Sequence, residues 1–360
     1  MTIARPPDAL TLILYTAVLV VAALVTMRRP SYGVAALVAA QPFALYGDIF
    51  GTTITIPKVV LAGVLLGVAS FPGAFAALAA ATPRRILIAG VLVLAATAAT
   101  FAQATYHAPV IRECLKALEY VVLFAVVVAA MCLDADRRPI RNALLGVTCV
   151  VALLALAQGA IRTPSAFLIN GHVLPRVAGP LEGPNQLAGF FDVALPIAFA
   201  FYVVQPSALA MSALFLGVFA DVLTFSRGGA FGAACGVVVV ALVLRHGVRR
   251  AFAVTGAGLA AGFAVSVFWG VAAHTLALAR FWEFNTPPGG GVGSRPVLWR
   301  AAIELWRRHP WFGIGAGNFE LEIAQTGVHG VRTHANSLYL QSLVEGGIPL
   351  LAATLWLQLV

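Results

Sequence analysis

Residues 10–27 read LTLILYTAVLVVAALVTM, an apolar run in which no charged side chain appears. A helix needs roughly 20 apolar residues to cross the hydrocarbon core of a bilayer. Inside that core only helices and closed barrels satisfy all of their own backbone hydrogen bonds. The run therefore predicts a membrane-spanning helix.

The rest of the chain has the same character. Of its 360 residues, 61% are hydrophobic and 10% are charged, and the mean hydropathy is +0.93. Soluble domains carry about 25% charged residues, so a water-soluble fold could not bury this much apolar surface. We expect residues 1–360 to form a single membrane domain of the all-α class.

Apolar runs separated by polar residues predict about eleven spans in this polytopic helical protein. The second run is short and contains Gln41 and Pro42, so we expect it to be tilted or broken. The predicted spans are residues 10–27, 33–47, 57–80, 86–103, 114–133, 142–161, 186–204, 208–225, 229–244, 251–273 and 337–360.

The net charge of +9 reflects basic residues in short loops between these runs. Such a distribution indicates topology rather than nucleic-acid binding, and the basic side should be cytoplasmic. This count places the N-terminus outside. The predicted cytoplasmic residues are Arg28, Arg29, Arg84, Arg85, Arg137, Arg138, Arg141, Arg245, Arg249 and Arg250. The predicted external segments are residues 103–113, 162–185, 226–228 and 274–336.

The chain ends and the cysteines add three expectations. Arg5 is the only basic residue before the first run, so we expect a retained span rather than a signal peptide. The sequence stops inside an apolar run, so we expect it to be shortened relative to its relatives. No CxxC pair or His at metal-ligand spacing is present, so we predict packing cysteines and no metal site. The four cysteines are Cys114, Cys132, Cys149 and Cys235.

The external segment at residues 274–336 is inserted between the last two predicted spans and is too polar to cross a bilayer. Its PPGGG sequence at 287–291 predicts a flexible hinge. Residues 295–309 then predict an amphipathic helix on or near the membrane surface. The residues at helical spacing are Trp299, Ala302 and Trp306.

Pro310 is expected to end this helix, and glycines alternate at positions 313, 315 and 317 just after it. Glycine adopts backbone conformations that other residues avoid, so the pattern predicts a tight turn near a ligand. It is not a dinucleotide-binding fingerprint, because no strand precedes it and the third glycine comes too early.

Three arginines lie next to glycines or prolines in the predicted external segments, and a fourth lies with the last of them on the predicted surface helix: Arg176, Arg227, Arg295 and Arg300. Guanidinium groups bind phosphate bidentately and keep their charge near lipid. A lipid that carries a diphosphate would explain several arginines on one face. The alternative is that each arginine is an interface anchor whose charged end reaches toward water.

His334 lies just before the last predicted span, in the sequence RTHANS at 332–337. An imidazole at the outer membrane surface is suited to acid–base chemistry, and His329 is the second choice. The alternative is that Thr333, Asn336 or Ser337 caps the helix and His334 merely borders it.

Three carboxylates lie inside apolar runs: Asp192, Asp221 and Glu345. An unpaired carboxylate is costly in a membrane, so we expect each to face a partner or water.

Four segments together resemble the O-antigen ligase and polymerase superfamily, and they occur in that family's order and spacing. They are RVAGPLEGPNQLA at 176–188, FSRGGA at 225–230, RPVLWRAAIELWRRHPWFGIGAG at 295–317 and HANSLYLQSLVEGG at 334–347. The first half of the chain matches in hydropathy alone.

The resemblance implies a membrane glycosyltransferase that uses a polyprenyl-diphosphate-linked glycan. Loop arginines, with Asn185 and Asn336, would hold the diphosphate and glycan, and His334 would activate an acceptor hydroxyl. Transfer would proceed with inversion, without a metal or nucleotide. The implied partners are the lipid-linked donor, the bilayer, and a lipid-core, growing-glycan or protein acceptor, with no nucleic acid.

One position departs from the family pattern. Aligned on Tyr339 to Gln341, the usual signature histidine corresponds to Asn336, and His334 lies two residues earlier. Leu350 also stands where a small residue is common. Either His334 acts from a shifted position or another base takes its place.

We therefore expect a multi-pass protein of the cytoplasmic membrane with its active site facing the periplasm or exterior. The leading hypothesis is glycan ligation, and repeat-unit polymerisation is the alternative within the family. A lipid or anionic-solute transporter or flippase is the alternative from another class, since Asp192 and Asp221 would suit a translocation path.

Overall fold

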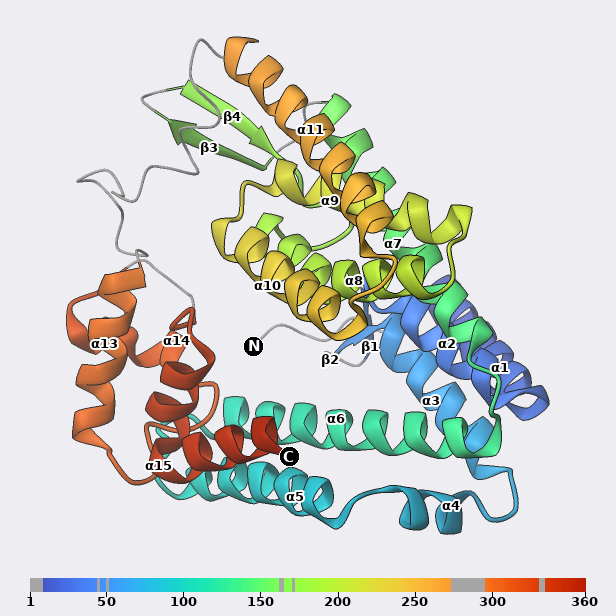
Figure 1. The fold of residues 1–360 in the computed structure, drawn as a ribbon. Coiled ribbons are helices and arrows are strands. Elements are labelled where there is room, and N and C mark those ends of the chain that lie inside the picture. Colours follow the sequence, from blue (N-terminus) through green and yellow to red (C-terminus); the bar gives the residue numbers. More distant parts are fainter. Residues whose placement is uncertain are drawn as a thin grey trace. The chain divides into compact units, whose positions relative to one another are not determined.

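The computed structural model describes residues 9–43, 46–49, 52–161, 165–169, 172–272, 295–329 and 334–360. The contacts within the chain divide it into two compact units (Figure 1). Unit 1 comprises residues 1–72 and 133–284, and unit 2 comprises residues 73–132 and 285–360. Each unit is described separately.

Unit 1 is a helical bundle with two short hairpins. Its central helix α8 (Pro184–Val204) packs against α9 (Ala208–Thr224) and α10 (Arg227–Leu244) (Figure 1). Phe191, Phe199 and Leu214 are fully buried between these helices. The remaining elements are α1 (Ala9–Arg28), α2 (Pro30–Ala40), β1 (Tyr46–Ile49), β2 (Thr52–Thr55), α3 (Ile56–Ala69), α7 (Arg138–Ile161), β3 (Ser165–Ile169), β4 (His172–Arg176) and α11 (Val248–Ala272).

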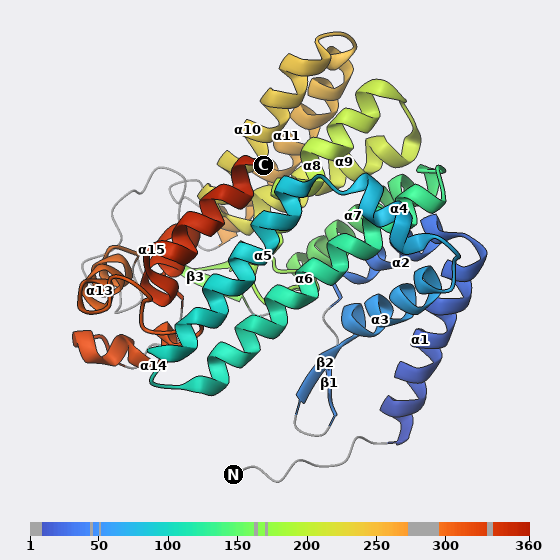
Figure 2. The same cartoon turned by 90° about the horizontal axis from the view of Figure 1, so that it is seen from below.

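Unit 2 combines segments from the middle and the end of the sequence. In it α15 (Leu338–Leu359) packs along α5 (Arg84–Ala99) and against α13 (Arg295–Arg308) (Figure 2). A second apolar cluster joins Leu298, Phe319 and Val344. The remaining elements are α4 (Ala74–Ala81), the 3₁₀ turn η1 (Thr100–Ala102), α6 (His107–Leu133), α14 (Phe319–Glu322) and the 3₁₀ turn η2 (Ile323–Thr326).

The predicted polytopic helical fold is confirmed, but the count of about eleven spans is not. Within the described residues, eight helices are long and apolar enough to cross a membrane, or nine if α3 and α4 form one broken span. The predicted span 57–80 is interrupted between Ala69 and Ala74. The helix α2 has 11 residues and is about 16 Å long, too short for a hydrocarbon core of about 30 Å.

The break expected in the second apolar run is present. The helix α2 ends at Ala40, and Pro42, two residues later, has no N–H to donate. The chain then forms the antiparallel hairpin β1–β2, with Tyr46 opposite Thr55. A second hairpin, β3–β4, precedes the Arg176 loop. Sequence analysis predicted neither hairpin, because their strands are only four or five residues long.

The helix predicted at residues 295–309 is confirmed as α13, which ends at Arg308 before Pro310. Its buried residues are Leu298, Ala301, Ala302 and Leu305, one stripe at helical spacing. Trp299, which we had placed on the apolar stripe, is 40% exposed. The predicted hinge at 287–291 lies outside the described residues.

Candidate functional site

Arg176 connects three segments of unit 1. Its Nε donates to the Thr224 carbonyl oxygen over 2.7 Å, and its Nη2 donates to the Asn185 Oδ1 over 3.2 Å. The neighbouring Val177 N–H donates to the Leu223 carbonyl oxygen over 3.2 Å. The Arg176 side chain is thus oriented by the end of α9 and the start of α8.

The start of α10 lies beside the start of α8. Ser226 caps α10 by accepting a hydrogen bond from the Gly229 N–H, and Arg227 is the first residue of the helix. A methyl group at Gly229 would overlap the Cβ of Ala188 on α8. Only glycine permits this approach, so Gly229 brings the half-buried Arg227 close to the first turn of α8.

This end of unit 1 has the properties of an anion site. The first N–H groups of a helix point outward, and the helix dipole makes that end partly positive. Here the starts of α8 and α10 meet, with Arg176, Asn185 and Arg227 beside them. Gln158 of α7 steadies the loop by accepting hydrogen bonds from the N–H groups at 178 and 179.

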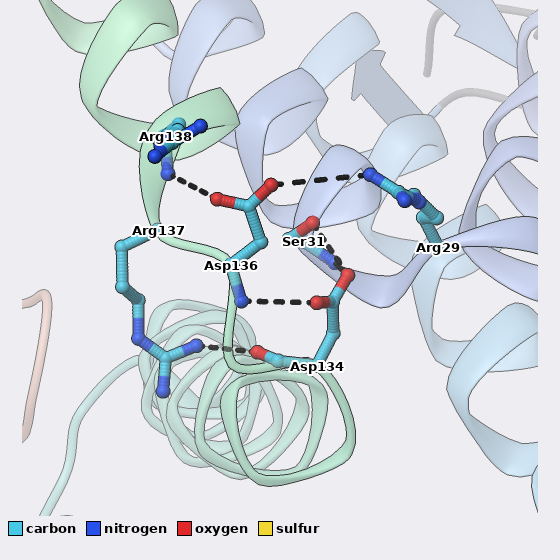
Figure 3. Close-up of polar contacts among 6 residues, drawn as sticks. All are labelled: Arg29, Ser31, Asp134, Asp136, Arg137 and Arg138. Carbon is cyan, nitrogen blue, oxygen red and sulfur yellow. Dashed lines mark hydrogen bonds and ion pairs between the residues drawn. The ribbon is translucent and has the colours of Figure 1, made fainter.

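Three of the connections predicted to be cytoplasmic lie together at the other end of unit 1. Arg29 forms an ion pair with Asp136 over 3.9 Å, and the Ser31 hydroxyl donates to Asp134 over 2.6 Å (Figure 3). Arg141 donates to Gln205, which follows α8. The connections before α2, before α7 and after α8 therefore share one side, as the charge pattern predicted.

Asp134 replaces a missing helix cap at this end. Arg29, the residue before α2, makes no side-chain cap bond, and Asp134 accepts the Ser31 N–H instead, over 3.3 Å. Hydrogen bonds from the Ser31 hydroxyl, and then from backbone N–H groups, hold the pKa of Asp134 below its ordinary value.

The two ends of unit 1 are separated by the length of α8. Asn185 lies in its first turn and Gln205 directly follows its last residue. At 1.5 Å per residue, this helix of 21 residues is about 32 Å long, close to the thickness of a hydrocarbon core. The Arg176 and Arg227 end is therefore opposite the basic end.

In unit 2 the last helix is broken where the glycine turn contacts it. Gly347 has φ 63° and ψ −159°, a conformation essentially restricted to glycine, and Pro349 has no N–H for the Glu345 carbonyl. The freed groups bond to the preceding loop. The Ile314 and Gly315 N–H groups donate to the carbonyl oxygens of residues 344 and 345 over 2.9 and 3.0 Å. The Ile348 N–H donates to the Pro310 carbonyl oxygen over 3.3 Å.

The tight turn predicted at residues 313–317 is confirmed, since all three of its glycines have positive φ. Asn318, which is fully buried, exchanges two hydrogen bonds of 3.0 Å with the backbone of Tyr106. Thr100 accepts the Ala316 N–H over 3.1 Å. The turn thus packs against residues 100–109. The sequence had given only a hydropathy signal for this segment. The predicted ligand near this turn stays a prediction.

His334 is exposed and comes just before α15. Ser337 caps this helix by accepting a hydrogen bond from the Leu340 N–H, which agrees with the cap alternative. Asn336 has a positive φ of 52°, and Ala335 is fully buried. The geometry fixes the backbone beside His334, and a catalytic role for the imidazole stays a prediction.

Arg295 and Arg300 project from the exposed part of α13. The buried stripe of α13 belongs to the same apolar cluster as Ala335. Unit 2 therefore carries Arg295, Arg300, His334 and Asn336 on one packed scaffold, while unit 1 carries Arg176, Asn185 and Arg227. The hypothesis that both sets act on one substrate stays a prediction.

The three carboxylates in apolar runs differ in their surroundings. Glu345 is buried and its Oε1 accepts the Phe319 N–H over 3.2 Å, so the expected partner is present. Asp192 and Asp221 each have one buried oxygen without a hydrogen-bond partner in the part of the chain that the structure describes. Gly232 of α10 leaves room for the Asp192 carboxylate.

Three amide side chains were not singled out from the sequence: Gln158, Asn318 and Gln341. Each lies within or beside an apolar segment and satisfies backbone N–H groups of a loop. A polar amide inside an apolar run was the available signal, because such a group must find partners when buried. Across the described ranges, no group of three His, Cys, Asp or Glu residues could hold a metal ion.

The fold defines the class first: this is a multi-pass helical membrane protein. Residues 212–355 match the family described as O-antigen ligase. This part of the chain is an O-antigen ligase domain, and the resemblance to the O-antigen ligase and polymerase superfamily is confirmed. The match includes Arg227, α13, the glycine turn and α15. No curated protein and no solved structure gives a significant match to the chain.

The family match carries a general function with it. Proteins of the O-antigen ligase and polymerase type are membrane glycosyltransferase-like enzymes that act on lipid-linked glycans. Arg176 and Asn185 precede the matched region. Arg176 bonds to Asn185 and also to Thr224, which lies within the matched region at the end of α9.

Proposed function

We propose that this protein transfers an oligosaccharide or polysaccharide from a polyprenyl-diphosphate carrier to an acceptor hydroxyl. The observation that carries the proposal is the bond from Arg176 to Asn185 at the start of α8, beside the start of α10, whose first residue is Arg227. Two helix N-termini and two guanidinium groups provide positive charge and directed donors for a diphosphate. The O-antigen ligase match begins within α9, directly before this turn.

The reaction would take place at the external face of the cytoplasmic membrane. The Arg176 end of unit 1 lies opposite the connections that contain Arg29, Arg137 and Arg141. Clustered basic residues favour the cytoplasmic side, which supports a diphosphate site on the exterior or periplasmic side. A polyprenyl carrier would supply its diphosphate at that interface.

In this mechanism His334 is the general base. It removes the proton from the acceptor hydroxyl while the acceptor oxygen forms a bond to the anomeric carbon of the glycan. The bond from that carbon to the diphosphate breaks, with inversion, and the polyprenyl diphosphate leaves. Arg176 and Arg227, with Arg295 and Arg300, stabilise the charge on the leaving diphosphate.

Asn185 and Asn336 are assigned to hydrogen bonding with the diphosphate or glycan. The Asn185 side chain already orients Arg176. We assign no metal to the reaction, since cationic side chains stabilise the leaving group in its place. The acceptor is a lipid core in the ligase reaction, and a growing glycan or a protein hydroxyl in the related reactions.

Two other functions have their own support. Repeat-unit polymerisation uses the same donor chemistry, and the family includes polymerases. Transport of a lipid or anionic solute is favoured by Asp192 and Asp221, whose carboxylates lie inside the helical bundle. Movement of a lipid-linked glycan across liposomes by the purified protein, with its glycan unchanged, would favour transport.

Mass analysis of lipid-linked and surface glycans from cells with and without the protein tests the proposal. Loss of ligation leaves full-length glycan on the lipid carrier, whereas loss of polymerisation leaves single repeat units. Arg227→Ala and His334→Ala should each reproduce the null phenotype. Arg250→Ala and His246→Ala are matched controls, exposed on the predicted cytoplasmic side, and should retain surface glycan. Full surface glycan in both test variants would refute the assignment.

A further inference from the structure

Two side chains of α15 hold loop segments of unit 2. The Ala335 N–H, in the residue after His334, donates to the Gln341 Oε1 over 2.7 Å. One turn further along α15, the Glu345 Oε1 accepts the Phe319 N–H over 3.2 Å.

The burial of Ala335 makes its hydrogen bond to Gln341 necessary. Ala335 is fully buried and Glu345 is 8% exposed. A buried N–H without a partner costs about 1–3 kcal/mol, so the Ala335 N–H needs the Gln341 oxygen. Gln341 and Glu345 are four residues apart on α15 and share one face of the helix.

We propose that Gln341 is a positioning residue for His334. It fixes the backbone at Ala335, one peptide unit from the histidine. This inference rests on the proposed function, in which His334 acts on the acceptor hydroxyl. Gln341 is assigned no contact with substrate.

The cap of α15 does not require the hydrogen bond between Gln341 and Ala335. Ser337 already caps the helix through the Leu340 N–H, so removal of the Gln341 amide leaves the cap in place. The amide is needed for the position of residues 334 and 335, which precede the cap. When the general base is misplaced, the rate of the chemical step falls, and a displacement of about 1 Å can cost about 100-fold.

The test measures transfer from a polyprenyl-diphosphate-linked glycan by purified, detergent-solubilised protein. Gln341→Leu should lower kcat by about 10- to 100-fold, with the KM for donor changed less than about threefold. Gln358→Leu is the matched control, since Gln358 is exposed on the same helix and bonds to Tyr339. It should keep the wild-type kcat.

Double variants separate positioning from a general loss of structure. If Gln341 acts through His334, the residual rate of His334→Ala should stay unchanged when Gln341→Leu is added. A purely structural role would lower that residual rate further. That result would overturn the inference.

The outcomes also distinguish this inference from the proposed function. Wild-type kcat in Gln341→Leu, alongside a strongly reduced kcat in His334→Ala, would overturn the inference and leave the proposed function standing. Absence of transfer by the wild-type protein would instead remove the proposed function. Should Gln341→Leu fail to fold, Gln341→Asn decides, because its shorter side chain keeps the amide but withdraws the accepting oxygen from Ala335.

Discussion

Replacement of Gly347 by alanine should strongly destabilise unit 2. An alanine Cβ at this position would lie 2.8 Å from the Phe312 backbone nitrogen and closer still to the Trp311 carbonyl. The backbone conformation, with φ 63° and ψ −159°, costs a residue other than glycine about 1–3 kcal/mol. Steric overlap adds about 1–3 kcal/mol, so we expect a total loss of about 2–6 kcal/mol.

Gly327→Ala is the matched control for this substitution. Gly327 also has a positive φ, of 78°, but a Cβ there would have no neighbour within 4 Å. Its expected cost is the conformational one alone, roughly 1–2 kcal/mol. Both variants lie in unit 2 and replace the same residue type, so their difference isolates the contact between the glycine turn and the break in α15.

The free energy of unfolding can be measured by reversible unfolding in mixed detergent micelles, followed by tryptophan fluorescence. We expect Gly347→Ala to lose at least about 1 kcal/mol more than Gly327→Ala. Equal losses, or a smaller loss at Gly347, would contradict the packing of residues 310–315 against the broken helix.

Three further predictions concern unit 1 and the reaction. Gly229→Val should push α10 away from Ala188 and abolish transfer, whereas Gly228→Val, where a Cβ has no neighbour within 4 Å, should retain it; equal activities measured in membranes would contradict the close approach. Because hydrogen bonds from Ser31 lower the pKa of Asp134, its contribution to stability should be complete at neutral pH and disappear only as pH falls below about 4. Unfolding of wild type and Asp134→Asn should therefore differ at pH 7 and converge in acid, and a difference that persists at low pH would contradict this. Chelation with EDTA should leave the rate of glycan transfer unchanged, and a loss restored by a divalent cation would refute a metal-independent reaction.

The sequence predicted long helices well because membrane spans are specified by composition. The apolar runs at 142–161 and 186–204 correspond to α7 and α8 within a few residues. Short elements were predicted less well. The helix α2 and the hairpin β1–β2 divide one apolar run, since hydropathy does not determine where an apolar segment bends.

The candidate residues were found by their chemical type, but their partners were not. Arginine next to glycine and proline indicated Arg176, whereas its bonds to Thr224 and Asn185 depend on how the loop before α8 meets the end of α9. Likewise, Glu345 was expected to have a partner. The identity of that partner, the turn after Pro310, follows from the break at Gly347, which tertiary contacts impose.

The most direct test is a reconstituted reaction with a defined polyprenyl-diphosphate-linked glycan and a hydroxyl-bearing acceptor lipid. Mass spectrometry would follow free polyprenyl diphosphate and glycosylated acceptor together. We predict equal amounts of both products from the wild-type protein, only a residual amount from His334→Ala, and little from Arg227→Ala, whose KM for donor should be raised. A wild-type protein that leaves the donor intact, or a His334→Ala variant as active as wild type, would contradict guanidinium-assisted glycan transfer with His334 as the base.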